Sequence, residues 1–148
     1  MKTHFLSFLG ILMLFGVNTC TDDQADAPLV GTTWNLQFFE IINGEKSAVG
    51  SQGMILILTE DGRVEGNAYR IEGDPDVYGN SYGGVYEVGL NDSLSIEITH
   101  TTYVGLPPGS RYEEYIQAIK NASAYEINGN MLNIFYDGRT KALNFEAE

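Results

Sequence analysis

Apolar and polar residues alternate through most of the chain after residue 29, with the two-residue period of β-strands. The alternation is cleanest in 93–99, where three apolar side chains are separated by polar ones and therefore share one face. It also runs through 34–38 but breaks at Phe38-Phe39, which predicts a β-bulge there. The continuous apolar run 54–58 predicts a strand that is buried on both faces.

Turn motifs divide these strands into hairpins. Asp61-Gly62, Asn128-Gly129 and Asp137-Gly138 each stand between two strand-like segments, and such dipeptides favour the tight turns of antiparallel hairpins. The strands that they join are 54–58 with 63–69, 124–127 with 131–136, and 131–136 with 141–145. Asn91-Asp92 provides a further turn before the strand at 93–99.

Two polar segments are predicted to be loops. The first follows the turn motif Asn43-Gly44 and continues to Gly53. The second covers most of 70–81, where turn-forming residues cluster: Glu72, Asp74, Asp76, Asn80 and Ser81. The next strand, 82–88, contains Gly83-Gly84, and glycines inside a strand mark a bulge, a bend or a close approach of another backbone.

One segment has the period of an α-helix. Its apolar stripe consists of Tyr112, Tyr115, Ile116 and Ile119. Ser110 and Glu113 have the spacing of a capping box, which predicts a helix start with reciprocal side-chain-to-backbone hydrogen bonds. Glu114 near the start and Lys120 near the end also suit the helix dipole. The whole pattern predicts a mainly β, small antiparallel barrel-like domain with one inserted α-helix (α+β).

The N-terminus resembles a bacterial lipoprotein signal. Lys2 is followed by the apolar run 5–17, which is too short to span a bilayer, and then by small residues and Cys20. In such signals the cysteine becomes the lipidated first residue of the mature chain. Two alternatives remain open, namely a conventional signal peptide cleaved at Ala25-Asp26-Ala27 and an uncleaved anchor.

The predicted organisation has three parts. They are a signal peptide at 1–19, an acidic tether at 20–28 and one domain at 29–148. Cys20 is the only cysteine, so an intrachain disulfide or a cysteine-based metal site is excluded. Its lipid would attach the protein to a membrane, and the outer membrane of the cell envelope is the predicted location. The acidic Asp22 and Asp23 resemble a signal for surface display in some Gram-negative lineages.

The net charge is −12, and it becomes −13 once 1–19 and the single lysine in that segment are removed. Such an acidic surface repels phosphate backbones, which argues against nucleic acid as a partner. The expected partner is therefore a protein or a component of the cell wall.

The sequence predicts no catalytic residue. His100, the only histidine beyond the signal peptide, stands at a strand end between threonines, and the chain contains no G-x-S-x-G elbow that would present a nucleophilic serine to it. Glycoside hydrolysis needs two carboxylates in one cleft. The adjacent pair Glu113-Glu114 already has an explanation at the start of the helix.

A calcium loop is the nearest approach to a metal site. Asp74, Asp76 and Gly79 stand at positions 1, 3 and 6 of such a loop. Tyr78 and Val85 stand at positions 5 and 12, where oxygen ligands are required, so we expect a solvated turn. No metal and no cofactor are predicted.

The motifs also follow one another in an order that is similar to that of a known family. The order begins with a Gly-Thr-x-Trp-x-Leu start, an apolar strand closed by Asp-Gly, and an Asn-x-Tyr-x-Gly-x-Tyr core. It continues with a strand that ends in a threonine turn and with a Glu-rich helix. It ends with Tyr-x-Ile-x-Gly-x-x-Leu and Leu-x-Phe. In this chain they are 31–36, 55–62, 80–86, 96–102, 112–119, 125–132 and 143–145. This order resembles the META domain, the family of a bacterial heat-shock lipoprotein known for novobiocin resistance. The resemblance implies a small envelope barrel and no reaction, and Gly79 stands where the family has a cysteine.

Three hypotheses about function follow. The first is a non-enzymatic, lipid-anchored envelope protein that acts through protein or cell-wall contacts, in envelope stress. The second is a lipocalin-like carrier, because 31–34 also resembles the opening strand of that group. The third is an acid-dependent hydrolase. The tyrosine- and glycine-rich segment 78–86 is predicted to be the bend and packing centre of the barrel, with core tyrosines that keep their hydroxyls at the rim.

Overall fold

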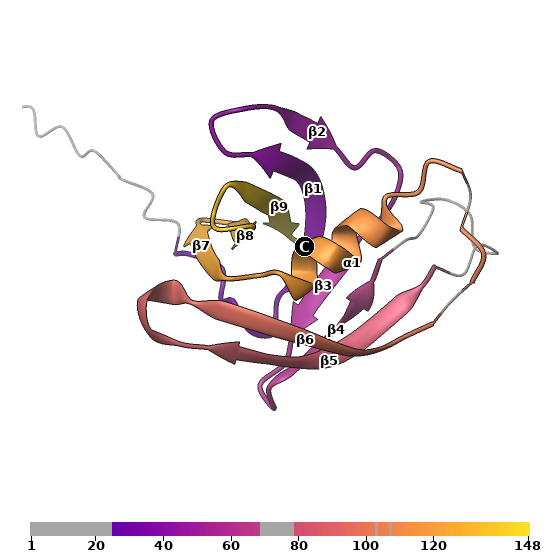
Figure 1. Ribbon diagram of the computed structural model, residues 1–148. Helices are drawn as coiled ribbons and strands as arrows, with labels where there is room; N and C mark the ends of the chain where they lie inside the picture. The colour runs from indigo at the N-terminus through magenta and orange to yellow at the C-terminus, as the bar shows by residue number, and fades with distance from the viewer. Residues whose placement is uncertain (1–24, 69–78, 103, 107) are drawn as a thin grey trace, which may run out of the picture.

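The computed structural model describes residues 25–68, 79–102, 104–106 and 108–148. Within these ranges nine strands, all antiparallel, form one curled sheet that encloses a single α-helix (Figure 1). The strands are β1 Thr33–Ile41, β2 Lys46–Ala48, β3 Ile55–Leu58, β4 Arg63–Asn67, β5 Ser81–Val88, β6 Leu94–Thr101, β7 Ala124–Asn128, β8 Met131–Tyr136 and β9 Lys141–Ala147. The helix is α1, Tyr112–Lys120, and a 3₁₀ turn, Leu90–Asp92, joins β5 to β6. The predicted fold class is confirmed.

The sheet is curled so strongly that its two end strands approach each other. Its order is β6-β5-β4-β3-β1-β9-β8-β7, with β2 added beside β1. At one end β6 and β7 meet through an isolated bridge between Ser93 and Ala124, and Leu94 N donates to Ser123 O at 3.2 Å. Beyond this bridge α1 packs against β6 and β8, so the helix occupies the space between the two edges (Figure 1).

The helix fills the interior of the curl with large side chains. All four residues of the predicted apolar stripe are buried, together with Ala118. Tyr115 contacts two other aromatic rings edge-on, Tyr82 with ring centroids 5.8 Å apart and Phe145 with centroids 6.4 Å apart. Tyr115, Phe145 and Trp34 from β1 have no exposed surface, and they form the centre of the core.

The predicted bulge in β1 is confirmed, one residue earlier than expected. The register between β1 and β9 shifts between Leu36 and Phe38, so the extra residue is Gln37. The shift returns an apolar side chain to the core: Phe39 is 4% exposed, whereas Phe38 points outward and is 37% exposed.

Two strand predictions need correction. The segment before Gly53 was predicted to be a loop, but Lys46–Ala48 within it forms β2 and pairs with Phe38–Glu40 of β1. All three of its residues are exposed, so backbone hydrogen bonding defines this strand and no apolar pattern reveals it. The run 54–58 is buried on one face only, because Leu56 and Leu58 are inaccessible while Ile57 on the outer face is half-buried.

The predicted capping box is wrong. The helix begins at Tyr112, whose N–H donates to Ser110 Oγ at 3.2 Å, and no side chain caps the helix from Arg111. The N–H of Arg111 donates instead to Gln52 Oε1 at 2.9 Å. A side chain from the loop before β3 therefore holds the start of the helix, and no local sequence pattern encodes that contact.

The last residues of the predicted tether contact the domain. Ala27 N donates to Gly129 O at 2.8 Å, and Gly129 N donates to Asp26 Oδ1 at 2.6 Å, so this segment is held against the β7–β8 turn. Cys20 and the predicted signal peptide lie outside the described residues. No helix in the ranges given above is long and apolar enough to cross a membrane.

Candidate functional site

Two glycines on adjacent strands make room for two rings on opposite faces of the sheet. On the inner face, Gly66 of β4 is paired with Tyr82 of β5. A Cβ on Gly66 would lie 2.6 Å from the Tyr82 hydroxyl oxygen and would overlap the carbonyl oxygen of Ile55. The tyrosine ring therefore depends on the absence of a side chain at Gly66.

The Tyr82 hydroxyl is part of a buried hydrogen-bond chain. It donates to Ile55 O at 3.0 Å and lies 2.8 Å from the Tyr115 hydroxyl, which must therefore act as the donor to Tyr82. Burial raises the pKa of both phenols well above the usual value. The prediction that strand tyrosines keep their hydroxyls at the rim is wrong for Tyr82, because its hydroxyl joins the sheet to Tyr115 of α1 inside the core.

On the outer face, Gly83 lies beneath the ring of His100. The two residues are paired between β5 and β6, and a Cβ on Gly83 would lie 2.5 Å from Cε1 of the imidazole. The register shifts between Gly83 and Gly84, so Thr99 of β6 is the extra residue of a β-bulge. Of the three features that the sequence allowed at Gly83-Gly84, a bulge is present, and Glu97 O also lies too close to Gly84 for a Cβ to fit. The bulge places Thr99 and His100 side by side on the outer face.

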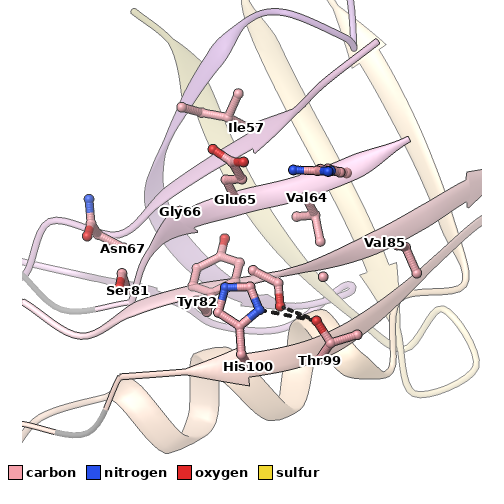
Figure 2. Close-up of a pocket in the computed structure, with 13 residues that line it drawn as sticks. Ile57, Val64, Glu65, Gly66, Asn67, Ser81, Tyr82, Val85, Thr99 and His100 are labelled. Carbon is pink, nitrogen blue, oxygen red and sulfur yellow. Dashed lines mark hydrogen bonds between the residues drawn. The ribbon is translucent and has the colours of Figure 1, made fainter. Parts of the chain in front are cut away.

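Thr99 fixes the orientation of the imidazole. Its hydroxyl donates to Gly83 O at 3.3 Å and lies 3.2 Å from His100 Nδ1. Since the hydroxyl proton is used on Gly83, Nδ1 is the donor to Thr99, and Nε2 remains as an acceptor. The ring is directed toward the side of the site that carries Glu65, as Figure 2 shows.

These residues border an open groove of about 590 Å³ on the outer face of β3 to β6, hereafter the sheet groove (Figure 2). It is lined by Ile57, Arg63, Val64, Glu65, Gly66, Asn67, Ser81, Tyr82, Gly83, Gly84, Val85, Thr99 and His100. Glu65 and His100 are both cross-strand partners of Gly83, so they stand on either side of a floor made of backbone. The groove thus combines an acid, a base, an imidazole, an amide and the aliphatic hydroxyls of Ser81 and Thr99.

The sequence singled out His100, without a catalytic role, and the segment 78–86, part of which lines the groove, but it did not single out Glu65, Asn67 or Thr99. Glu65 and Asn67 of β4 and Thr99 of β6 are exposed or half-buried positions, and only the strand register brings the two strands to the same groove. Period-two alternation could have placed each of them on an outer face, but it does not say which strands are neighbours. No carboxylate is hydrogen-bonded to His100 among the described residues, so the imidazole lacks the orienting acid of a catalytic triad.

Asn80, predicted to lie in an exposed loop, is almost completely buried, with 1% of its surface exposed. Its Oδ1 accepts from Val104 N at 2.5 Å, and its Nδ2 donates to Val104 O at 3.2 Å. Its own carbonyl accepts from Ala68 N at 2.8 Å. This asparagine therefore ties three segments together at one end of the groove. Asp74 and Asp76 of the rejected calcium loop lie outside the described residues.

A second charged cluster lies at the mouth of the barrel and has a structural explanation. The guanidinium of Arg111 lies 3.7 Å from the ring centroid of Phe39 and forms two hydrogen bonds, of 2.7 and 2.8 Å, with Glu114. It also donates to Ser47 Oγ at 2.9 Å. Burial, followed by repulsion from Glu114, raises the pKa of Tyr136 to about 12. The cluster joins α1 to the β1–β2 hairpin, and each charge in it has a partner within the fold.

The described residues contain no group of three or more His, Cys, Asp or Glu side chains that could hold a metal ion. Fold and groove together define a small antiparallel β domain of the curled, barrel-like class, with an internal helix and a polar groove on its outer face.

Comparison with known proteins supports this class. A DUF4847 family protein from Bacteroides vulgatus ATCC 8482 has a similar crystal structure, with a TM-score of 0.56 and 16% sequence identity. The alignment covers 80% of this chain and 93% of that chain, so the likeness extends over nearly the whole neighbour and concerns the fold. No protein-family model matches the chain. A search of curated proteins gave no match either.

Proposed function

We propose that this protein is a lipid-anchored, non-enzymatic component of the bacterial cell envelope, with a META-like domain that binds a partner through the sheet groove. The observation that carries the proposal is the groove itself: an open, polar site with a backbone floor between Glu65 and His100. The apolar run 5–17 followed by Cys20 supports attachment to a membrane, and the motif order supports the META-like assignment. The outer membrane, with display on the cell surface, is the proposed location.

Binding suits the groove better than catalysis does. Glu65 is the only carboxylate among its described lining residues, so the paired acids of a glycoside hydrolase are not assembled there. The Nδ1 proton of His100 is directed to a threonine hydroxyl, which cannot stabilise an imidazolium as a carboxylate would. These features give the acid-dependent hydrolase little support.

The interior gives equally little support to a lipocalin-like carrier. Trp34, Tyr115 and Phe145 fill the centre of the curl and have no accessible surface. A carrier needs an enclosed cavity that can bury most of its ligand. The sheet groove is open to solvent and half polar, so a partner would bind against the surface.

The proposed partner is a protein rather than a neutral glycan. Arg63 and Glu65, both on β4, present both signs of charge at the groove, and complementary charges provide specificity at protein interfaces. A role in envelope stress would be exercised through this contact.

Replacement of Cys20 with alanine should abolish lipidation. The expected result is that the wild-type protein incorporates labelled palmitate in bacterial cells and fractionates with membranes, whereas the Cys20→Ala protein does neither. Labelling that persists in the variant would contradict the proposed anchor. A Ser51→Ala protein, changed at an exposed position of the domain, is the control and should label normally.

A photoreactive amino acid at Val85 should capture the partner. Val85 lines the groove and is 46% exposed, so the probe reaches solvent without disturbing the core. We expect a discrete cross-linked protein in envelope fractions, reduced about tenfold when Glu65 is replaced with lysine, which corresponds to the loss of one favourable charge contact of about 1.4 kcal/mol. The same probe at the exposed Lys120 of α1 is the control. Equal products from both positions would contradict binding at the groove.

A further inference from the structure

The opposite half of the sheet contains a buried amide with an unused acceptor. Asn144 of β9 is 3% exposed, and its Nδ2 donates to Oδ1 of Asn133, its cross-strand neighbour on β8, at 2.7 Å. Its own Oδ1 has no hydrogen-bond partner, and within the ranges described it is the one buried side-chain polar atom in this condition. Buried acceptors are almost always paired, because water that is lost on burial must be replaced.

Exchanging the amide atoms does not remove the problem. If both asparagines were turned so that Asn133 donates to Asn144, the nitrogen of Asn144 would become the unpartnered atom in place of the oxygen. One polar atom of Asn144 therefore stays without a partner in either orientation. The unpartnered atom lowers the stability of the protein without a ligand. A bound group that supplies the missing hydrogen bond would remove this loss of stability.

Asn144 lines a second cavity, hereafter the amide pocket, of about 330 Å³. The pocket is formed by Phe38, Lys46, Asn128, Met131, Asn133 and Asn144, and it shares no residue with the sheet groove. Its volume is within the range of roughly 300–1,000 Å³ that is typical of small-molecule sites. Its lining residues come from β1, β2, β7, β8 and β9.

The lining suits a neutral ligand that has both hydroxyl groups and an apolar face. Three asparagine amides supply donors and acceptors, and Phe38, which the β1 bulge turns outward, supplies a ring that is 37% exposed. The ammonium of Lys46 is 3.1 Å from Glu40, so its charge is already paired. Phe38 is the direct cross-strand neighbour of Asn144. Because Asn144 Oδ1 has almost no accessible surface, a ligand can reach it only if a neighbouring side chain moves.

We propose that the amide pocket binds a sugar ring, with a ligand hydroxyl donating to Asn144 Oδ1 and a second hydroxyl bound by Asn133. Phe38 contacts the apolar face of the ring. The site is independent of the sheet groove, since it lies on other strands, and it does not require the function proposed for that groove.

The test is a titration of the ¹⁵N-labelled domain with three probes: methyl glucoside, methyl galactoside and N-acetylglucosamine. We expect at least one sugar to shift the side-chain amide signals of Asn133 and Asn144 saturably, with a dissociation constant on the order of 1 mM. Asn144→Leu should weaken this binding by about tenfold or more while the melting temperature is maintained or raised, because the unpartnered oxygen is removed. Asn133→Ala, at a half-buried position, is the second variant should Asn144→Leu not fold.

Glu65→Lys is the control that separates the two sites, and sugar binding should be unchanged in it. The proposal is overturned by three sugars that leave both amide signals unshifted, by shifts confined to the sheet groove, or by equal affinity in wild type and Asn144→Leu. If Val85 gave no cross-linked partner while sugar binding was intact, the function proposed for the sheet groove would be rejected and the proposal for the amide pocket would stand.

Discussion

Replacing Gly66 with alanine should destabilise the protein by roughly 2–6 kcal/mol, the sum of overpacking and the loss of a buried hydrogen bond. A Cβ at this position would overlap the Ile55 carbonyl oxygen and meet the Tyr82 hydroxyl at 2.6 Å. The tyrosine would have to move, and its hydrogen bonds to Ile55 and Tyr115 would break. Urea unfolding followed by circular dichroism measures the change.

Gly105→Ala is the matched control for this experiment. A Cβ on Gly105 meets no atom within 4 Å, so the substitution should change the free energy of unfolding by no more than about 0.5 kcal/mol. If the two alanine variants proved equally stable, the ring of Tyr82 could not be held as described.

Alkaline pH should unfold the protein through the same pair of tyrosines. Burial raises the folded-state pKa of Tyr82 and Tyr115 well above the value near 10 that the unfolded chain has. Their contribution to stability is therefore complete below pH 10, because both phenols are neutral in both states. Above that pH the unfolded state releases protons that the folded state retains. The free energy of unfolding should fall by about 1.4 kcal/mol per pH unit for each tyrosine.

The double variant Tyr82→Phe/Tyr115→Phe separates this effect from general alkaline damage. It should lose less stability per pH unit above pH 10, and the slope that remains should include Tyr136, whose pKa is raised to about 12. Denaturant unfolding over a pH series gives the slopes, and ultraviolet absorbance of tyrosinate reports ionisation. Ionisation of both residues near pH 10 in the still-folded wild type would contradict the burial argument.

The sequence was sufficient for the fold because most elements are locally encoded. The three hairpin turns at Asp61-Gly62, Asn128-Gly129 and Asp137-Gly138 join strands as predicted, and the helix buries the predicted stripe. Elements that depend on distant partners were missed. Strand β2 exists because its backbone pairs with β1, and the start of α1 is held by the distant Gln52 as well as by the local hydroxyl of Ser110.

The candidate groove was less predictable than the fold, for a physical reason. Glu65 and His100 flank the same groove only because both pair with Gly83, and the β5–β6 register contains a bulge at Thr99. The glycine pair indicated a bulge, a bend or a close backbone approach. Where such a bulge lies relative to β6 depends on strand pairings that no single segment encodes. The unpartnered amide of Asn144 could not be predicted from the sequence either. The alternating pattern of a strand predicts that an asparagine is exposed on the outer face.

The pairing of β1 with β9 has a consequence for how the chain matures. The two strands match from Trp34 with Ala147 to Ile41 with Lys141, so the middle of the sheet joins the first strand to the last. Contacts of such sequence separation are slow to form, because a long loop must close first. The sheet cannot be completed until the C-terminal residues are available. A chain that emerges from the ribosome N-terminus first would carry an open sheet edge at β1 until β9 has been synthesised.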